Sequence, residues 1–469
     1  MLIAAMSSVS SHGVESVNPY TTALFTGLLV LMILCLALEE KLHAKKSLIV
    51  GLFATGALLI GGILGILPFG PVMLPNGHAI EMPIYISAID WGVITIIVGS
   101  SLFIEVTSKS GLFSWIAIRL TKASAGNPVR LLWYYGVMTV VFSAVLNNVT
   151  AMIIVGSLTS VSLTKLEKND LLLGFLLVEG LLTNIGGLLT LISSVPNIIV
   201  GNAAGISFVS FFMTSAPYVV IATVLTIFLG TKLFKIKPLL SESEQQKAAE
   251  LVNTFDENDG IESMVFFRFS TFMLLAFILI IATTSMLPVV SELGMGFVAL
   301  AFAVLILVRY KSEVDQFYKS IDWDLIIFFM ALFVFIVVIE HAQVLQLIGH
   351  GIQFVIGNDE SSYGVAMLLF VSSVFSSVTD NIPLAAMLSK VLASAATTPD
   401  SSLWWSVIFG ANLGGNLTPI GSASTLVAVT IIHRAGIKLS FAGFVKQALP
   451  FAICHILLAI GYVLVLSLF

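Results

Sequence analysis

The chain contains several runs of about 20 apolar residues, the length that crosses the hydrocarbon core of a bilayer as a helix. Clear examples lie at 20–38, 46–66, 210–231 and 441–469. Of the 469 residues, 58% are hydrophobic and only 10% are charged, whereas soluble domains are about one quarter charged. We therefore expect an all-α, polytopic integral membrane protein whose surroundings are the lipid bilayer.

The first 19 residues contain no Lys or Arg. Because a secretory signal begins with a basic segment, the first apolar run is predicted to be a retained span and residues 1–19 an external tail. Cys35 and Cys454 lie in apolar runs and are expected to be small buried side chains, not a disulfide or metal pair. The net charge of −5 gives no reason to expect a nucleic-acid partner.

The distribution of Lys and Arg predicts the orientation, because these residues are enriched in cytoplasmic loops. Both termini are predicted to lie outside, and the polar segment 238–265 is predicted to be a cytoplasmic linker. It divides the chain into two transmembrane parts, 20–237 and 266–469. Residues 107–130 are expected to lie along the inner surface, and Lys390 departs from the charge pattern. A bacterial inner membrane is the expected location.

The apolar block 131–164 is interrupted by Asn147-Asn148, and basic residues flank both of its ends. A segment with cytoplasmic markers at both ends has to enter and leave the membrane on the same side. We therefore predict a re-entrant helical hairpin whose tip is the Asn pair. The second such block, 362–397, is interrupted at Asp380 and is predicted to form another hairpin.

Two further stretches combine apolar residues with glycine and proline. Residues 170–201 contain Asn-Ile-Gly-Gly from position 184, and residues 403–433 contain Asn-Leu-Gly-Gly from position 412. A helix broken inside the membrane leaves unpaired backbone groups, which are tolerated only where protein or a cavity satisfies them. Each stretch is predicted to cross the membrane as a broken helix.

These interruptions belong to an internal repeat. Three segments recur in the same order, at offsets of 232, 233 and 228 (321 − 89, 380 − 147 and 412 − 184): Ile-Asp-Trp at 89 and 321, Asn-Asn at 147 with Asp-Asn at 380, and the two Gly-Gly segments. Each half is predicted to cross the membrane five times, and because five is odd, the halves would be inverted relative to each other. Inverted repeats with broken helices are typical of secondary transporters that bind their ligand near the midplane.

The polar residues at the breaks are the predicted binding residues. A carboxylate at membrane depth costs about 2.5 to 3.5 kcal/mol on insertion scales, so Asn or Ser would cap a helix at a lower cost. Asp380 is therefore predicted to bind Na⁺ or H⁺, with Asn381 as a second Na⁺ ligand. The predicted substrate- and ion-binding set is Asn147, Asn148, Thr150, Asn184, Gly186, Gly187, Thr190, Asp380, Asn381, Asn412, Gly414, Asn416, Thr418 and Ser422.

Each assignment has a structural alternative. The Asn and Asp side chains could cap their helices, and the small residues of the broken helices could serve helix packing. Glu179 is a second acid at membrane depth, for which a proton relay and a buried pair are equally open. Three further acids, Glu105, Glu340 and Asp322, lie near span ends and are expected to be solvated. Lys390 is expected to reach the outer surface.

The motifs at these breaks resemble the ion transporter superfamily, in particular the group of D-type sodium/proton antiporters, bacterial arsenite permeases, the P protein and citrate-transporter-like proteins. The segments that carry the resemblance are 182–187, 195–197, 379–383 (Thr-Asp-Asn-Ile-Pro) and 410–421. The resemblance implies an elevator-like transporter, often a homodimer, in which the part holding both hairpins moves against a scaffold. This chain departs from the antiporter-like relatives, which carry Asp-Asn at the first hairpin and Gly-Asp before the Pro-Pro-Asn of the first broken helix.

Two functions follow from these patterns. The first is secondary active sodium/proton antiport, electroneutral because Na⁺ and H⁺ compete for the single core acid Asp380. The alternative is Na⁺- or H⁺-coupled transport of a small anion or oxyacid such as arsenite, a dicarboxylate or sulfate, which the missing acid of the first hairpin favours. No cofactor other than these coupling ions is expected. The inverted repeat disfavours a channel. An enzyme is not expected, because the sequence shows no nucleophile–base pair at membrane depth.

Overall fold

The structure, a computed structural model, describes residues 17–73, 79–311, 314–356, 361–379, 381–395 and 397–468. Within these ranges the chain is almost entirely helical, apart from one short antiparallel strand pair between the second and third long helices. The core is one continuous cluster of buried aliphatic and aromatic side chains contributed by both halves of the chain.

The elements of the first half and of the linker follow in chain order. They are α1 (Pro19–Ala37), α2 (Glu39–Leu42), α3 (Lys46–Ile63), β1 (Val72–Met73), β2 (Ala79–Ile80), α4 (Ile84–Ser87), α5 (Trp91–Ser108), α6 (Leu112–Ala123), α7 (Pro128–Val145), α8 (Asn148–Lys165), η1 (Asn169–Leu171), α9 (Leu172–Gly186), α10 (Val195–Ala204), α11 (Phe208–Leu233) and α12 (Glu242–Asn253).

The second half contains the remaining helices. They are α13 (Met264–Ala282), η2 (Thr284–Met286), α14 (Pro288–Leu307), η3 (Val308–Tyr310), α15 (Val314–Ser320), α16 (Trp323–His341), α17 (Val344–Ile356), α18 (Ser362–Val378), α19 (Asn381–Ser394), α20 (Ser402–Gly414), α21 (Ala423–Arg434) and α22 (Phe441–Leu466).

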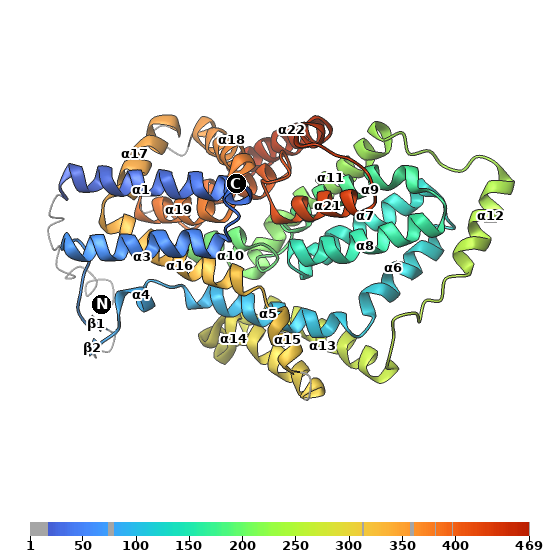
Figure 1. The fold of residues 1–469 in the computed structure, drawn as a ribbon, viewed down its shortest axis with the longest axis horizontal. Coiled ribbons are helices and arrows are strands. Elements are labelled where there is room, and N and C mark those ends of the chain that lie inside the picture. The colour runs from blue at the N-terminus through green and yellow to red at the C-terminus, as the bar shows by residue number, and fades with distance from the viewer. Residues whose placement is uncertain are drawn as a thin grey trace.

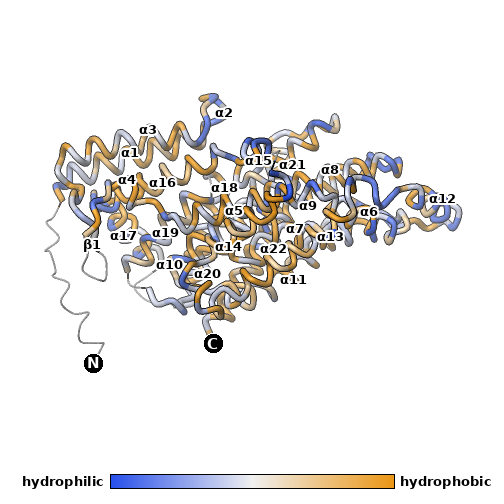
Figure 2. The backbone as a smooth tube through the Cα atoms, turned by 90° about the horizontal axis from the view of Figure 1, so that it is seen from below, coloured by the Kyte–Doolittle hydropathy of each residue, from blue (hydrophilic) through white to orange (hydrophobic). Residues whose placement is uncertain are grey.

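In the described part of the chain, ten helical segments are long and apolar enough to cross a membrane: α1, α3, α5, α7, η1 with α9, α11, α13, α14 with η3, α16 and α22. Shorter apolar helices occur at the predicted breaks, namely α10, α18, α19 and α21. Figure 2 shows apolar residues along the long helices and polar residues concentrated in α2, α12 and the region of α15. The protein is thus an integral membrane protein.

Local sequence explains where the key helices begin. Asp90 and Asp322, which the internal repeat relates, accept hydrogen bonds from the backbone N–H groups three residues on, at 3.1 and 3.0 Å. They cap α5 and α16 in the same way. Asn147 caps α8, because its side-chain oxygen accepts from the N–H of Thr150 at 2.8 Å. The chain between α7 and α8 is therefore a turn of two residues.

The contacts between the helices divide most of them into two groups. Figure 1 shows α1 and α3 of one group side by side, with α5, α13 and α14 along the lower edge. We call α1, α3, α5, α13, α14 and α16 the scaffold group, and α7 to α11 together with α18 to α22 the core group. In the scaffold group, α16 of the second half packs along α3 of the first, and α5 packs along α14. Gly99 permits the second contact, since a Cβ there would lie 2.5 Å from the backbone of Ala299. In the core group, α10 packs against α19 and α21 against α8, so the two halves interlock in matched pairs.

The linker packs on the protein more closely than a solvated connection would. Val252 and Phe255 are buried, and the Lys165 ammonium lies 4.8 Å from the centre of the Phe255 ring. Arg119 of α6 forms an ion pair with Glu257 at 2.6 Å. The linker, which includes α12 at the right of Figure 1, therefore contacts α6 and the end of α8.

Candidate functional site

A cavity of about 450 Å³ lies between the core group and the scaffold group. The starts of α8, α10, α19 and α21 form its core wall, while α5 and the start of α16 form the opposite wall. Its polar lining residues are Ser101, Glu105, Ser108, Asn147, Asn148, Thr150, Asn184, Ser193, Ser194, Ser320, Asp322, Asn381, Ser422 and Ser424.

The two walls differ in electrostatic character. Four helix N-termini meet at the core wall, and each carries the positive end of a helix dipole. At α10 no side chain caps the helix, and its first two residues, Val195 and Pro196, line the cavity. The scaffold wall carries the carboxylates of Glu105 and Asp322. Among the described lining residues there is no Lys, Arg or His.

Six residues of the predicted binding set line the cavity: Asn147, Asn148, Thr150, Asn184, Asn381 and Ser422. Seven others do not line it and lie behind the core wall: Gly186, Gly187, Thr190, Asn412, Gly414, Asn416 and Thr418. Asp380 lies outside the described residues, between the end of α18 and the start of α19. The binding set of the sequence thus divides into residues that can touch a ligand and residues that support them.

Asn184, which lines the cavity, is the centre of a hydrogen-bond network of buried side chains at the core wall. Its Nδ2 donates to Asn416 Oδ1 at 2.8 Å and to Ser422 Oγ at 3.0 Å. Its Oδ1 accepts from Ser424 Oγ at 3.1 Å and from Asn148 Nδ2 at 3.3 Å. One side chain of α9 therefore links the tip between α7 and α8 to the start of α21.

Asn412 makes the corresponding contacts from the second half. Its Oδ1 accepts from Ser194 Oγ at 2.7 Å, and its Nδ2 donates to Asn197 Oδ1 at 2.8 Å. The offset of 228 that relates Asn412 to Asn184 also relates Ser422 to Ser194 (422 − 194 = 228). Each half therefore uses an amide of its first half-helix to hold the start of the other half's second half-helix.

The two predicted threonines have matched structural contacts. Thr190 Oγ1 donates to the carbonyl of Ala144 at 2.5 Å, and Thr418 Oγ1 donates to that of Ser377 at 2.5 Å. The offsets are 228 for the threonines (418 − 190) and 233 for the acceptors (377 − 144). Both hydroxyls satisfy carbonyls at the end of α7 or α18, which have no partner within their own helix.

The predicted glycines serve close packing of the breaks. A Cβ on Gly186 would lie 2.6 Å from the carbonyl oxygen of Val140, and one on Gly414 would meet the carbonyl of Ser373. A Cβ on Gly187 would lie 2.5 Å from Asn148 Oδ1. Gly187 therefore leaves the space that the amide of Asn148 occupies at the cavity wall.

Glu179 does not reach the cavity. It is fully buried on α9, and its Oε1 accepts a hydrogen bond from Thr159 Oγ1 of α8 at 2.6 Å. Its Oε2 has no hydrogen-bond partner among the described residues. The contact that the structure shows is with a hydroxyl group of the neighbouring helix.

The sequence predicts that Glu105 is solvated, yet in the structure Glu105 is only partly exposed and lines the cavity. The available signal was its spacing: Ser101, Glu105 and Ser108 occur at positions i, i+4 and i+7 and so share one face of α5. His455 was also missed. It is fully buried on α22 beside Asn416, and a lone histidine in an apolar run was the only indication.

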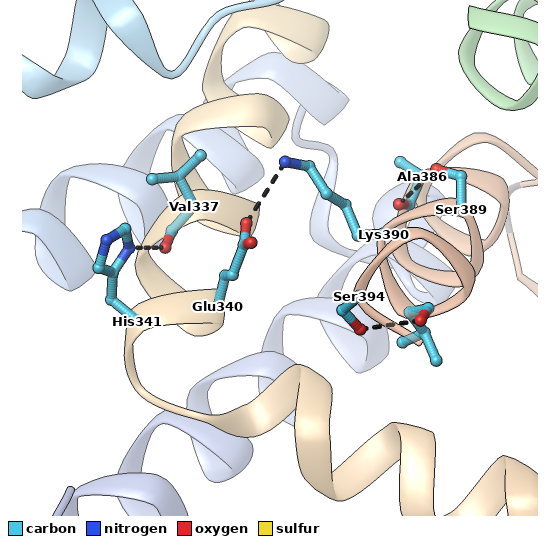
Figure 3. Close-up of polar contacts among 8 residues, drawn as sticks. Val337, Glu340, His341, Ala386, Ser389, Lys390 and Ser394 are labelled. Carbon is cyan, nitrogen blue, oxygen red and sulfur yellow. Dashed lines mark hydrogen bonds and ion pairs between the residues drawn. The ribbon is translucent and has the colours of Figure 1, made fainter. Parts of the chain in front are cut away.

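One ion pair connects the two helix groups directly. Lys390 Nζ of α19 lies 3.4 Å from Glu340 Oε2 of α16, with both side chains roughly half exposed (46% and 44%). Figure 3 shows the two side chains extending toward each other from their helices. Lys390 thus finds a carboxylate on the scaffold group, where the sequence had suggested only contact with the outer surface.

Comparisons with known proteins agree with this architecture. The family model described as "Citrate transporter" matches residues 47–410. A 46 kDa membrane protein of Mycobacterium leprae is 29% identical over 378 residues, which cover 80% of this chain and 86% of that protein. The human P protein is 23% identical over 534 residues, covering 96% of this chain and 60% of the P protein.

A solved structure supports the fold. The YdaH transporter of Alcanivorax borkumensis superposes with a TM-score of 0.58 over 90% of this chain and 98% of that one, at 11% sequence identity. The resemblance predicted from the motifs at the breaks is confirmed by the family match and by the P protein. This chain is a membrane transporter that belongs to the citrate transporter family.

Proposed function

We propose that the protein is a secondary active transporter that carries a small anion through the cavity between its two helix groups, coupled to Na⁺ or H⁺. The observation that carries the proposal is the convergence of four helix N-termini on one cavity wall. Such termini bind carboxylate and phosphate groups without basic side chains. The family description, citrate transporter, points to the same class of substrate.

The same contacts support inverted repeats and an elevator-like movement. The hydrogen bonds of Asn184 and Asn412 follow a single offset of 228, and helices of the two halves pair in a matched way. We propose that α7 with α8 and α18 with α19 are re-entrant hairpins, and that the core group moves as one body against the scaffold group, within a homodimer. With the orientation predicted from Lys and Arg, the cavity would lie on the cytoplasmic side, because it is lined by the end of α5 and the start of α16.

Sodium/proton exchange at Asp380 is the second candidate function. Two observations favour it: Asn381, which adjoins Asp380 in the chain, lines the cavity, and so does the carboxylate of Glu105. Carboxylate and amide oxygens are suitable ligands for hard cations. If the protein is such an exchanger, Na⁺ and H⁺ would bind alternately in the cavity, and no organic ligand would bind there.

Reconstituted protein in liposomes separates the two. Uptake of radiolabelled citrate, succinate, sulfate and arsenite is measured with an inward Na⁺ gradient, with a pH gradient, and with neither, while an internal dye reports pH. Accumulation of an anion against its gradient supports anion transport. A pH change on addition of Na⁺ without anion accumulation supports exchange, and protein-free liposomes give the background for both.

A further inference from the structure

A hydrogen-bonded chain runs from the cavity wall to a buried histidine. Asn184, at the wall, donates to Asn416, and Asn416 Nδ2 lies 3.4 Å from Nδ1 of His455 on α22. His455 Nε2 lies 2.7 Å from Oγ1 of Thr226 on α11. None of these four side chains is more than 1% exposed, so water cannot replace a missing partner within the chain.

The hydrogen atoms of this chain can be assigned from its end. The Thr226 hydroxyl has a single hydrogen, which it donates to the carbonyl of Ala222 at 2.6 Å. While Thr226 keeps this bond, Nε2 of His455 supplies the hydrogen of the His455–Thr226 bond, which leaves a lone pair on Nδ1. That lone pair accepts from Asn416 Nδ2. The Tyr218 hydroxyl also donates to the carbonyl of His455 at 3.0 Å, which holds the backbone behind the ring.

The orientation of Asn416 decides that of Asn184. The Nδ2 of Asn416 is directed at Nδ1 of His455 and at the carbonyl oxygen of Leu181, to which it donates at 3.3 Å. Asn416 therefore presents Oδ1 to Asn184, whose Nδ2 donates to it. The Oδ1 of Asn184 is then directed toward Asn148 and Ser424, both of which line the cavity. Reversing one amide alone would set two acceptors or two donors against each other, and a buried polar group without a partner costs about 1 to 3 kcal/mol.

Packing of the repeat does not require this chain. The offset of 228 places Leu188 at the position equivalent to Asn416 (416 − 228 = 188), and Leu188 is fully buried among apolar side chains. The first half fills this place with an apolar residue. The polar branch with His455 and Thr226 at its end therefore has no counterpart at the equivalent place in the first half.

We propose that His455 is a positioning residue which, through Asn416 and together with the Leu181 carbonyl, fixes the side of the Asn184 amide that faces the cavity. The inference deepens the proposed function and rests on it: a fixed amide orientation selects the ligand group that binds at the wall. Because the Asn184 carbonyl holds the Asn148 amide, Asn148 keeps a constant orientation beside the anion. If His455 were protonated at Nδ1, its N–H would face Nδ2 of Asn416, and the two donors would weaken this orientation.

A spectroscopic experiment tests the assignment without any substrate. The full-length protein is labelled with ¹⁵N-histidine and placed in lipid nanodiscs, and His455→Asn identifies the signals of His455. We expect a ring protonated at Nε2 and unprotonated at Nδ1. Thr226→Val should shift these signals, because Nε2 loses its acceptor. Protonation at Nδ1 in the wild type, or unchanged signals in Thr226→Val, would overturn the proposal.

Thr223→Val is the matched control. Thr223 lies one turn before Thr226 on α11, is buried, and donates to the carbonyl of Val219 at 2.6 Å. Within the part of the chain that the structure describes, Thr223 forms no hydrogen bond with His455. Both variants remove one hydroxyl group that is bonded to a carbonyl of its own helix. A difference between their imidazole signals is therefore caused by the loss of the Thr226–His455 contact. We expect the imidazole signals of Thr223→Val to match those of the wild type.

Uptake of radiolabelled citrate by proteoliposomes tests the consequence. Thr226→Val should raise the Km about tenfold, the effect of about 1.4 kcal/mol, with the Vmax unchanged. His455→Asn keeps an acceptor near the position of Nδ1 and should retain the Km, whereas His455→Gln places its amide near Nε2 and should raise it. Equal Km values for Thr226→Val and Thr223→Val would overturn the proposal.

Absence of anion uptake in the wild type would refute the proposed function instead. The imidazole spectrum would still show which nitrogen of His455 is protonated.

Discussion

Asn184 and Asn412, 228 positions apart, each bond the serine at the start of the other half's second half-helix, Asn184 as donor and Asn412 as acceptor, but only Asn184 faces the cavity. Asn184 bonds Ser422 at the start of α21, and Asn412 bonds Ser194 at the start of α10. Of the two amides, Asn184 lines the cavity and Asn412 does not. Because Asn184 and Asn412 make corresponding contacts but only Asn184 reaches the cavity, mutations of the two residues can separate an effect on stability from an effect on transport.

We predict that Asn184→Ala and Asn412→Ala both destabilise the protein, by about 1 to 3 kcal/mol each, because their partners are left buried without hydrogen bonds. Thermal unfolding in detergent measures this loss. Asn184→Ala should also raise the Km for the transported anion, while Asn412→Ala should leave it near that of the wild type. A similar Km increase in both variants would contradict the division between lining and supporting residues.

Gly187→Ala should impair transport more than stability. The added methyl group would lie 2.5 Å from Asn148 Oδ1, so the Asn148 amide has to leave its place at the cavity wall. Overpacking of this kind costs about 1 to 3 kcal/mol. Gly51→Ala on α3 is the control, because nothing lies within 4 Å of a Cβ there. Uptake kinetics of the two variants should differ clearly, and equal kinetics would disprove the steric argument.

Movement of the core group against the scaffold group predicts that a covalent bond between α16 and α19 stops transport. Glu340→Cys with Lys390→Cys, in a variant without the native cysteines, replaces the ion pair of Figure 3 by a bond that a thiol-specific cross-linker can close. We expect uptake to fall to background after cross-linking and to return after reduction of a cleavable cross-linker.

The control for this cross-link lies within the scaffold group. Ser47 of α3 donates a hydrogen bond to Asp324 of α16, and both helices stay together in the proposed movement. Ser47→Cys with Asp324→Cys should therefore cross-link without loss of uptake. If the pair between α16 and α19 is cross-linked as completely and transport continues, the elevator-like mechanism is wrong.

Asp380→Asn should remove the dependence of transport on its coupling ion. If the protein carries an anion, uptake should no longer respond to a Na⁺ or pH gradient; if it exchanges Na⁺ for H⁺, the Na⁺-driven pH change should disappear. Glu105→Gln tests the second acid near the pathway in the same assays. Asp400→Asn, at an exposed position before α20, is the control and should behave like the wild type.

Much of this architecture could be predicted from the chain. The long apolar runs predicted an integral membrane protein, and the paired motifs at the breaks predicted the family that the comparisons confirm. The reason is that a bilayer allows few structures, since backbone groups have no water to bond with. Breaks in such a chain are conspicuous, and glycine, asparagine and proline mark them within a few residues.

The individual partners of the polar residues could not be predicted in this way. Whether an asparagine at a break faces a ligand or a neighbouring helix depends on how the helices are rotated against one another, and the sequence pattern around Asn184 and Asn412 is nearly the same. Glu105 and His455 received no role for this reason, although the first lines the cavity and the second ends the buried chain.

The sequence by itself therefore determined the membrane class, the positions of the breaks and the internal repeat, because these depend on local composition and on a solvent that restricts the backbone. Only the tertiary structure decided which polar residues meet. Asn184 and Ser422 are 238 positions apart, and their contact arises from packing α9 against α21. Helix packing brings four helix N-termini to one cavity wall and the carboxylate of Glu105 to the opposite one.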